Sequence, residues 1–306
     1  MHTTGWKKTL KDWMLPIAMA GGALFHEWIH YLTFLSPYLI FLMLTVTYCR
    51  VEPRDLRLGP FHWRLLIAQM MMALIALLML LPLGHNVATG VFICFFVPTA
   101  TAAPVITSML GGSITKVASY SLLCNLFVAF SGPVILAAIG DHPEIGFFES
   151  FLMICRSVVP LLILPMITAF SLAKIWPRAH DCIRDNQSIS FYMWALALFI
   201  VVGSSVSFVI RVYTPALIPQ LIMLLVLSFL ACIAQFAVGK AAGRKYHEVI
   251  AGGQALGQKN TVLGIWLALA YLNPVASIAP AGYVAWHNIV NSWQLIRYRR
   301  HSRREA

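Results

Sequence analysis

Gly252–Gly264, with the sequence GGQALGQKNTVLG, is the stretch that decides the fold. It lies within an otherwise apolar segment, yet it contains several glycines, followed by Gln258, Lys259, Asn260 and Thr261. Glycine lowers helix stability, and amides and an ammonium are costly in hydrocarbon. Such a run survives at membrane depth only where protein or a water-filled cavity surrounds it. It predicts a discontinuous transmembrane helix whose interruption forms a binding site, with a polar loop between two short helices as the simpler alternative.

The composition around this stretch is that of a membrane protein. The chain has 306 residues, of which 59% are hydrophobic and 11% charged, whereas about a quarter of the residues of a soluble domain are charged. Apolar runs such as Leu65–Leu83, Ile189–Ile210 and Ala216–Val238 are of the length that crosses a bilayer. The six cysteines lie singly, without metal or disulfide spacing. We therefore expect an all-α polytopic membrane protein with no cofactor.

The net charge of +11 does not indicate a nucleic-acid partner, because the basic residues are divided among alternate connections. The clusters are Lys7, Lys8 and Lys11; Arg50, Arg54, Arg57 and Arg64; Lys174, Arg178 and Arg184; Lys240, Arg244 and Lys245; and Arg297, Arg299, Arg300, Arg303 and Arg304. Cytoplasmic loops are enriched in Lys and Arg in this way. The pattern predicts a multi-pass protein of the cell (inner) membrane with both termini in the cytoplasm.

The apolar runs predict ten membrane segments, at roughly 13–26, 31–49, 63–83, 88–110, 114–139, 148–174, 189–211, 215–238, 246–271 and 274–297. The fourth is also interrupted, by Val97–Pro104 (VPTATAAP), in which two prolines remove backbone donors. The two interruptions are about 155 residues apart, and each falls in the fourth segment of a five-segment half. Because five is odd, the second half would be inverted relative to the first. We expect two inverted repeats, 1–140 and 141–306, with two unrelated interruptions as the alternative.

Several patches resemble the bile acid:sodium symporter family. Lys259–Ser292, including Trp286–Asn288, resembles its last two helices. Pro98–Gly112 and Ser113–Pro133 resemble its fourth and fifth helices, and Gln69 falls where the family has a glutamine in its third helix. The resemblance implies a core domain (segments 63–139 and 215–297) and a panel domain (segments 13–49 and 148–211). It places the substrate between them and sodium sites behind the crossed helices.

The departures from the family concern its sodium ligands. The adjacent Ser-Asn ligands of its fourth helix correspond to Ala103 and Pro104, and a glutamate of its ninth helix corresponds to Ala255. The glutamine before its crossing asparagine is replaced by Lys259. Of two hydroxyls on its fifth helix, one is replaced by Val117 and the other is retained as Ser121. Most of the sodium ligands are therefore missing.

Lys259 would place an ammonium where the family binds a cation. A buried lysine at this depth costs a few kcal/mol on insertion scales, so we expect partners such as Gln69, Gln258 or freed backbone carbonyls. We hypothesise that Lys259 replaces bound sodium and that transport is sodium-independent. Two alternatives stay open: that Lys259 only extends to an aqueous cavity, and that sodium binds the neutral ligands Gln69, Ser121, Gln254 and Asn260.

A second motif raises a different class. His26–His30 (HEWIH) fits the HExxH pattern, in which two histidines bind zinc and the glutamate activates water. An intramembrane metalloprotease would need a third ligand, and no acidic residue lies near Asn273–Pro274 to provide one. The motif also falls in a short external connection. We expect interfacial anchoring there, and no enzyme.

Taken together, the sequence predicts a secondary transporter that moves a small or amphipathic organic anion by alternating access. Helix N-termini carry partial positive charge, and those of the two second half-helices, near Thr101 and Thr261, would point at one place beside Lys259. We expect the substrate to contact Thr99, Thr101, Asn260, Thr261, His287, Asn288 and Arg156. We expect the ion site or its replacement to contain Lys259, Gln69, Ser121, Gln254 and Gln258. Arg156 could instead reach the headgroups, and the two residues of the last segment could be helix–helix contacts. The sequence does not decide substrate identity, coupling ion, direction or oligomeric state, and a monomer is compatible with it.

Overall fold

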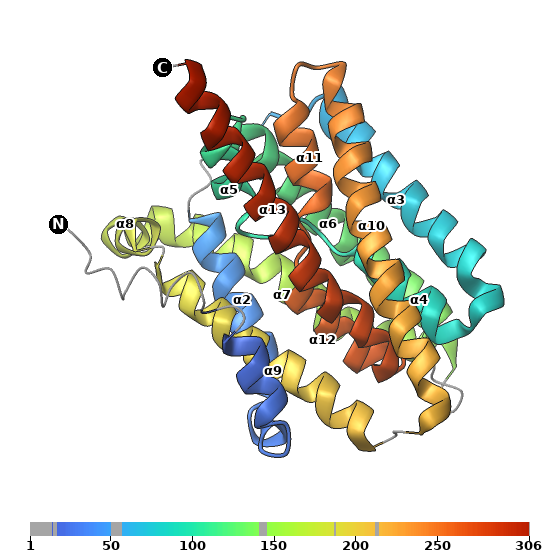
Figure 1. Cartoon of the computed structure of the whole chain (residues 1–306). Helices are drawn as coiled ribbons and strands as arrows, with labels where there is room; N and C mark the ends of the chain where they lie inside the picture. The colour runs from blue at the N-terminus through green and yellow to red at the C-terminus, as the bar shows by residue number, and fades with distance from the viewer. Residues whose placement is uncertain are drawn as a thin grey trace.

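The computed structural model describes residues 14, 17–49, 57–140, 146–186, 188–211 and 214–305, and these residues are almost entirely helical (Figure 1). After a helical stretch at 17–24, the α-helices are α2 (Leu35–Tyr48), α3 (Pro60–Leu80), α4 (His85–Phe96), α5 (Ala103–Met109), α6 (Ile114–Ile139), α7 (Phe147–Ile175), α8 (Pro177–Asp185), α9 (Ser188–Arg211), α10 (Ile218–Arg244), α11 (Val249–Gly257), α12 (Thr261–Tyr271) and α13 (Ile278–Glu305). Short 3-10 turns are η1 (Ile29–Tyr31), η3 (Leu81–Leu83), η4 (Pro215–Leu217) and η5 (Pro274–Ser277).

Five helical stretches are long and apolar enough to cross a membrane: Pro60–Leu83, Ile114–Ile139, Phe147–Ile175, Tyr192–Arg211 and Pro215–Arg244. Three shorter helices, α2, α4 and α12, are also apolar. The prediction of a helical membrane protein is confirmed. The number of spans, the repeat and the core and panel domains stay predictions, as does the orientation of the termini.

Both predicted interruptions are present as gaps between short helices. The first separates α4, which ends at Phe96, from α5, which begins at Ala103. The second separates α11, which ends at Gly257, from α12, which begins at Thr261. The helix after the first interruption was predicted to start near Thr101. It starts at Ala103, about half a turn later. Thr101 lies in a turn before α5, because Thr99 and Ala100 are extended and pair with the other interruption.

The glycines of the opening stretch have a different role from the one predicted. Gly252 and Gly253 lie inside the regular helix α11, not in its interruption. A Cβ on Gly252 would approach the carbonyl oxygen of Gly239 in α10 to 2.3 Å, and a Cβ on Gly239 would approach that of Gly252 to 2.2 Å. These glycines let α10 and α11 pack backbone to backbone, which holds α11 beside the long helix α10.

The first half-helices of the two interrupted pairs, α4 and α11, approach each other from opposite ends of the molecule (Figure 1). In Figure 1, α11 descends from the end of the molecule that contains the C-terminus, and α4 approaches from the other end. α4 ends at Phe96 and α11 at Gly257, and the segments that follow these two ends pair with each other at Thr99 and Lys259. The connection after α7, predicted as a cytoplasmic loop, contains the short helix α8, in which Arg184 pairs with Asp181 at 2.9 Å.

The close approach of α10 and α11 makes a stability prediction. We expect Gly252→Ala to destabilise the protein by about 1–3 kcal/mol, because the added methyl group meets backbone that a side-chain rotation cannot move. Gly132→Ala in α6 is the matched control, since a Cβ there meets its nearest neighbours at 3.8 Å. Thermal unfolding of the purified protein in detergent compares the two. Equal melting temperatures would show that α10 and α11 are farther apart than described.

Candidate functional site at the helix crossing

The two interruptions pair with each other as a single antiparallel bridge between Thr99 and Lys259. The Ala100 N–H donates to the Gln258 carbonyl over 3.0 Å, and the Asn260 N–H donates to the Pro98 carbonyl over 2.8 Å. Backbone groups that leave a helix inside a membrane have no water to bond. Each interruption therefore supplies the backbone partners that the other has lost. We call this junction, formed by residues 97–102 and 258–260, the helix crossing.

One side chain from each interruption also caps the first half-helix of the other. Lys259 Nζ donates to the Val97 carbonyl, next to the end of α4, over 3.1 Å. Thr99 Oγ1 donates to the Ala255 carbonyl, in the last turn of α11, over 2.7 Å. The last carbonyls of a helix lack intrahelical partners, and the helix dipole favours a cation there. The ammonium of Lys259 thus lies at the partially negative end of α4.

Lys259 is enclosed by protein. Its side chain is 1% exposed, and it is among the largest fully buried side chains of the described residues. None of the carboxylates that the structure describes forms an ion pair with it. The negative charge that faces the ammonium is therefore the partial charge of a freed backbone carbonyl, that of Val97. Freed backbone carbonyls are among the partners that the sequence predicts for Lys259. The alternative in which Lys259 only extends to an aqueous cavity is not favoured by this burial and by the bond to Val97.

Gln69 of α3 and Tyr120 of α6 complete the cap of α4. Gln69 Nε2 donates to the carbonyls of Phe96 and Val97 over 3.0 and 3.2 Å. The Tyr120 hydroxyl donates to Gln69 Oε1 over 2.6 Å, which orients the amide. Gln69 was predicted to belong to an ion site, and it lies beside Lys259 through their shared acceptor, Val97. Its amide nitrogen, not its oxygen, faces that carbonyl.

A second glutamine–tyrosine pair serves the other half-helix. The Tyr283 hydroxyl of α13 donates to the Gly257 carbonyl at the end of α11 over 2.9 Å. Gln235 Nε2 of α10 donates to that hydroxyl over 2.8 Å and to the Cys94 carbonyl of α4 over 3.2 Å. Sequence reasoning did not identify this pair or Tyr120. The available signal was a glutamine and a tyrosine inside apolar runs of each half.

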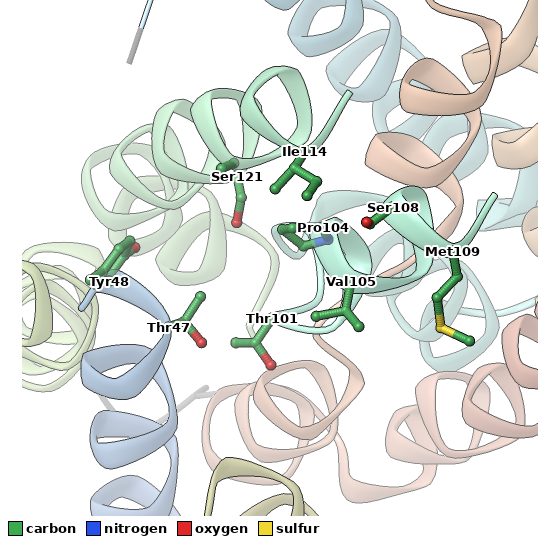
Figure 2. A pocket seen from close by; sticks show the side chains of 10 residues that line it. Thr47, Tyr48, Thr101, Pro104, Val105, Ser108, Met109, Ile114 and Ser121 are labelled. Atoms are coloured by element: carbon green, nitrogen blue, oxygen red, sulfur yellow. The ribbon is translucent and has the colours of Figure 1, made fainter. Parts of the chain in front are cut away.

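A pocket of ≈ 370 Å³ lies beside the crossing, between α2 and the α5–α6 hairpin (Figure 2). It is lined by Thr47, Tyr48, Thr101, Pro104, Val105, Ser108, Met109, Ile114, Ala118 and Ser121. These residues are apolar or carry hydroxyls, and none of them is charged. In Figure 2 the side chains of Thr101 and Thr47 approach the space from the interruption and from α2. The pocket can take an apolar body and offer hydroxyl groups to a polar end.

The predicted substrate residues do not all meet there. Of these residues Thr101 lines the pocket, and so does Ser121, which was predicted for the ion site or its replacement. Thr99 and Thr261 are buried in the crossing, and the Asn260 side chain accepts from the Leu263 N–H as the N-cap of α12. In the described conformation the Thr99 hydroxyl and the Asn260 amide oxygen thus bond to the backbone. That these residues contact substrate stays a prediction.

The remaining candidates lie elsewhere. Asn288 donates to the Val284 carbonyl of its own helix over 2.6 Å, and the neighbouring His287 is buried. Gln258 donates to Gln254, so these two form a pair on α11 next to the crossing. Arg156 lies exposed on α7 and is not among the residues that line the pocket. The structure therefore separates a buried crossing, a pocket beside it and a polar face of α11 and α13.

The HExxH segment is not a regular α-helix. Residues 25–28 form a turn and His30 belongs to η1, so His26 and His30 do not lie one helical turn apart on one face. The His30 ring nitrogen Nδ1 is bonded to the Glu27 carbonyl at 2.8 Å. Among the described residues, no group of three His, Cys, Asp or Glu side chains is placed to bind a metal ion. No observation favours the protease alternative.

Comparison with protein families and with curated proteins finds no match for the chain. The resemblance to the bile acid:sodium symporter family therefore rests on Gln69 and on the segments Pro98–Pro133 and Lys259–Ser292 alone. It stays a prediction.

The reciprocal capping makes a second prediction. We expect Thr99→Val to destabilise the protein by about 1–3 kcal/mol, because the buried Ala255 carbonyl loses its donor. Thr99→Ser retains the hydroxyl and should unfold close to the wild-type temperature. Thr107→Val is the control for loss of a buried threonine hydroxyl, since Thr107 donates only to Ala103 within its own helix. Thermal unfolding in detergent is the measurement. A Thr99→Val protein as stable as Thr107→Val would contradict the role of the cap.

Proposed function

We propose that the protein is a secondary transporter that moves a small or amphipathic organic anion by alternating access, without bound sodium. The observation that carries the proposal is the ammonium of Lys259, buried where two interrupted apolar helices cross. An intramembrane charge is costly and by default marks a functional site. Discontinuous helices that meet at mid-depth are typical of transporters, in which they form substrate and ion sites.

The surroundings of Lys259 support its role as a replacement for a cation. Sodium is a hard cation that takes oxygen ligands, by analogy with calcium and magnesium. The Val97 carbonyl has two lone pairs, and it accepts from both Lys259 Nζ and Gln69 Nε2. No lone pair of this oxygen is left for an ion. The oxygen of Gln69 accepts from the Tyr120 hydroxyl over 2.6 Å, which disfavours the sodium-coupled alternative, in which Gln69 would be a ligand.

The crossing also supports the proposed inverted repeat, an arrangement found in many alternating-access transporters. Each half contributes an interruption, a side chain that caps the other half, and a hydrogen-bonded glutamine–tyrosine pair. The second pair follows the first by about 165 residues along the chain, similar to the spacing of the interruptions. Two unrelated interruptions would not be expected to share these partners.

The pocket supports the substrate class. It lies between α2, which the resemblance assigns to the panel, and α5 and α6, which it assigns to the core. Its lining suits an apolar body, and hydroxyl groups such as those of Thr101 and Ser108 can donate to an anionic end. The positive charge of Lys259 acts from behind the crossing, through a medium of low dielectric constant in which charges interact strongly. Transport would move the core relative to α2 and expose the same site on the other side.

A binding screen followed by flux measurement tests the proposal. Thermal shift of the purified protein with a bile-acid anion, a short aliphatic carboxylate and an aryl sulfonate identifies a ligand. Uptake of that ligand into proteoliposomes, with sodium or with choline as the only external cation, then tests coupling. We expect equal uptake in both media. Strict dependence on sodium would overturn the replacement, and binding without flux would indicate a sensor or scaffold.

Lys259→Ala is the decisive variant. We expect uptake to fall at least roughly tenfold or to require an external cation, because removal of the ammonium leaves the end of α4 without its counter-charge. Lys174→Ala, at an exposed position on α7, is the matched control for loss of one lysine. Unchanged uptake with unchanged ion dependence in Lys259→Ala would contradict the role assigned to this residue.

A further inference from the structure

A row of polar side chains crosses from α11 to α13 at Gln294 and then follows α13 toward its N-terminal end. Gln258 Nε2 donates to Gln254 Oε1, and Gln254 Nε2 donates to Gln294 Oε1 over 3.2 Å. Asn291 and His287 extend the row along α13, since residues three and four apart share one face of a helix. We call these five side chains the amide row.

Three atoms of the amide row have no hydrogen-bond partner among the described residues. They are His287 Nδ1, Asn291 Oδ1 and Gln294 Nε2. His287 is 4% exposed and Asn291 is 5% exposed, so bulk solvent does not reach most of these side chains. Buried polar atoms in native proteins are almost always paired, with protein or with ordered water. Three in succession along one helix face therefore indicate a bound hydrogen-bonding species.

Exchanging the nitrogen and oxygen of the glutamine amides does not remove the need for a bound hydrogen-bonding partner. Amide nitrogen and oxygen are placed by the hydrogen-bond pattern, and here each glutamine donates to the next. Reversal of one glutamine would bring two donors or two acceptors together. Reversal of all three would leave the oxygen of Gln294 as its free atom in place of the nitrogen. Either way one buried atom of Gln294 needs a partner.

We propose that the amide row binds a chain of water molecules, which forms a hydrated path from the C-terminal end of α13 to the helix crossing. Along α13, His287 and Asn291 are separated by ~6 Å and Asn291 and Gln294 by ~4.5 Å, at 1.5 Å per residue. One water molecule with two hydrogen bonds of about 2.8 Å bridges such a separation. Water also supplies both donors and acceptors, as the mixed set of unpartnered atoms requires.

The two ends of the row fit a path of this kind. At the outer end Gln294 is half-buried, and Arg297, one turn further along α13, is exposed. At the inner end the His287 ring lies 5.6 Å from the ring of Tyr283, whose hydroxyl donates to the Gly257 carbonyl at the end of α11. The path thus ends beside the tyrosine that caps α11 at the helix crossing. This hydration does not depend on the proposed transport activity.

Cysteine accessibility tests the path without a substrate or a flux. In a Cys155→Ser, Cys182→Ser background, which removes the thiols that are not buried, Asn291→Cys is treated in detergent with a negatively charged methanethiosulfonate. We expect it to react at least roughly tenfold faster than Val284→Cys, because thiol reactivity requires access to water. Val284 is the control, since it is fully buried on the same helix. Equal rates at 291 and 284 would overturn the proposal, and His287→Cys gives the same test at the next position.

A stability comparison tests the same proposal on side chains of similar size. Asn291→Leu excludes water from the row, so we expect a lower melting temperature than that of the wild type or of Asn291→Ser, which can still bond water. If the row were dry, leucine would replace an unsatisfied acceptor and raise the melting temperature. A value for Asn291→Leu equal to or above the wild type therefore overturns the proposal, whatever the outcome of the transport assays.

Discussion

Backbone groups that leave a helix inside a membrane must find partners within the protein, and the rest of this structure depends on that constraint. The two interruptions meet it together, through backbone bonds on either side of the Thr99–Lys259 bridge. The ends of α4 and α11 are then capped by side chains from five other places in the chain: the two interruptions, α3, α10 and α13. Few substitutions at the crossing can therefore be neutral, because most of its polar groups serve a carbonyl that has no other donor.

The same constraint explains why the charge at the helix crossing is an ammonium that bonds to a backbone carbonyl. A lysine in hydrocarbon needs acceptors, and interrupted helices offer freed carbonyls at a partially negative end. Lys259 uses one of them, Val97, which Gln69 shares. The ammonium is therefore part of the scaffold as well as a charge that a substrate could sense. The pocket lies beside this scaffold, where α2 approaches α5 and α6, and its lining is free of charged side chains.

Close packing of the half-helices depends on residues with no side chain. Gly239 and Gly252 place the backbones of α10 and α11 in direct contact, as small residues do at helix interfaces in membranes. The rigid pairing fixes where α11 ends and hence where Lys259 and Gln258 lie. α11 is also linked to α13 by the hydrogen bond between Gln254 and Gln294, and the unpartnered atoms of the amide row lie along α13.

The sequence by itself determined that the chain is a helical membrane protein, that two of its helices are interrupted, and where: a run of apolar residues broken by prolines, or by amides and a lysine, has few other solutions in a bilayer. It also indicated that Lys259 would be bound by freed carbonyls. It could not distinguish glycines that interrupt a helix from glycines that pack one, as Gly252 does, because both lower helix propensity in the same way. Nor could it show that Thr99 bonds to the Ala255 carbonyl, or find Tyr120, Gln235 and Tyr283. Those roles depend on contacts between residues tens to more than a hundred positions apart, and only the tertiary structure decides which hydroxyl or amide reaches which carbonyl.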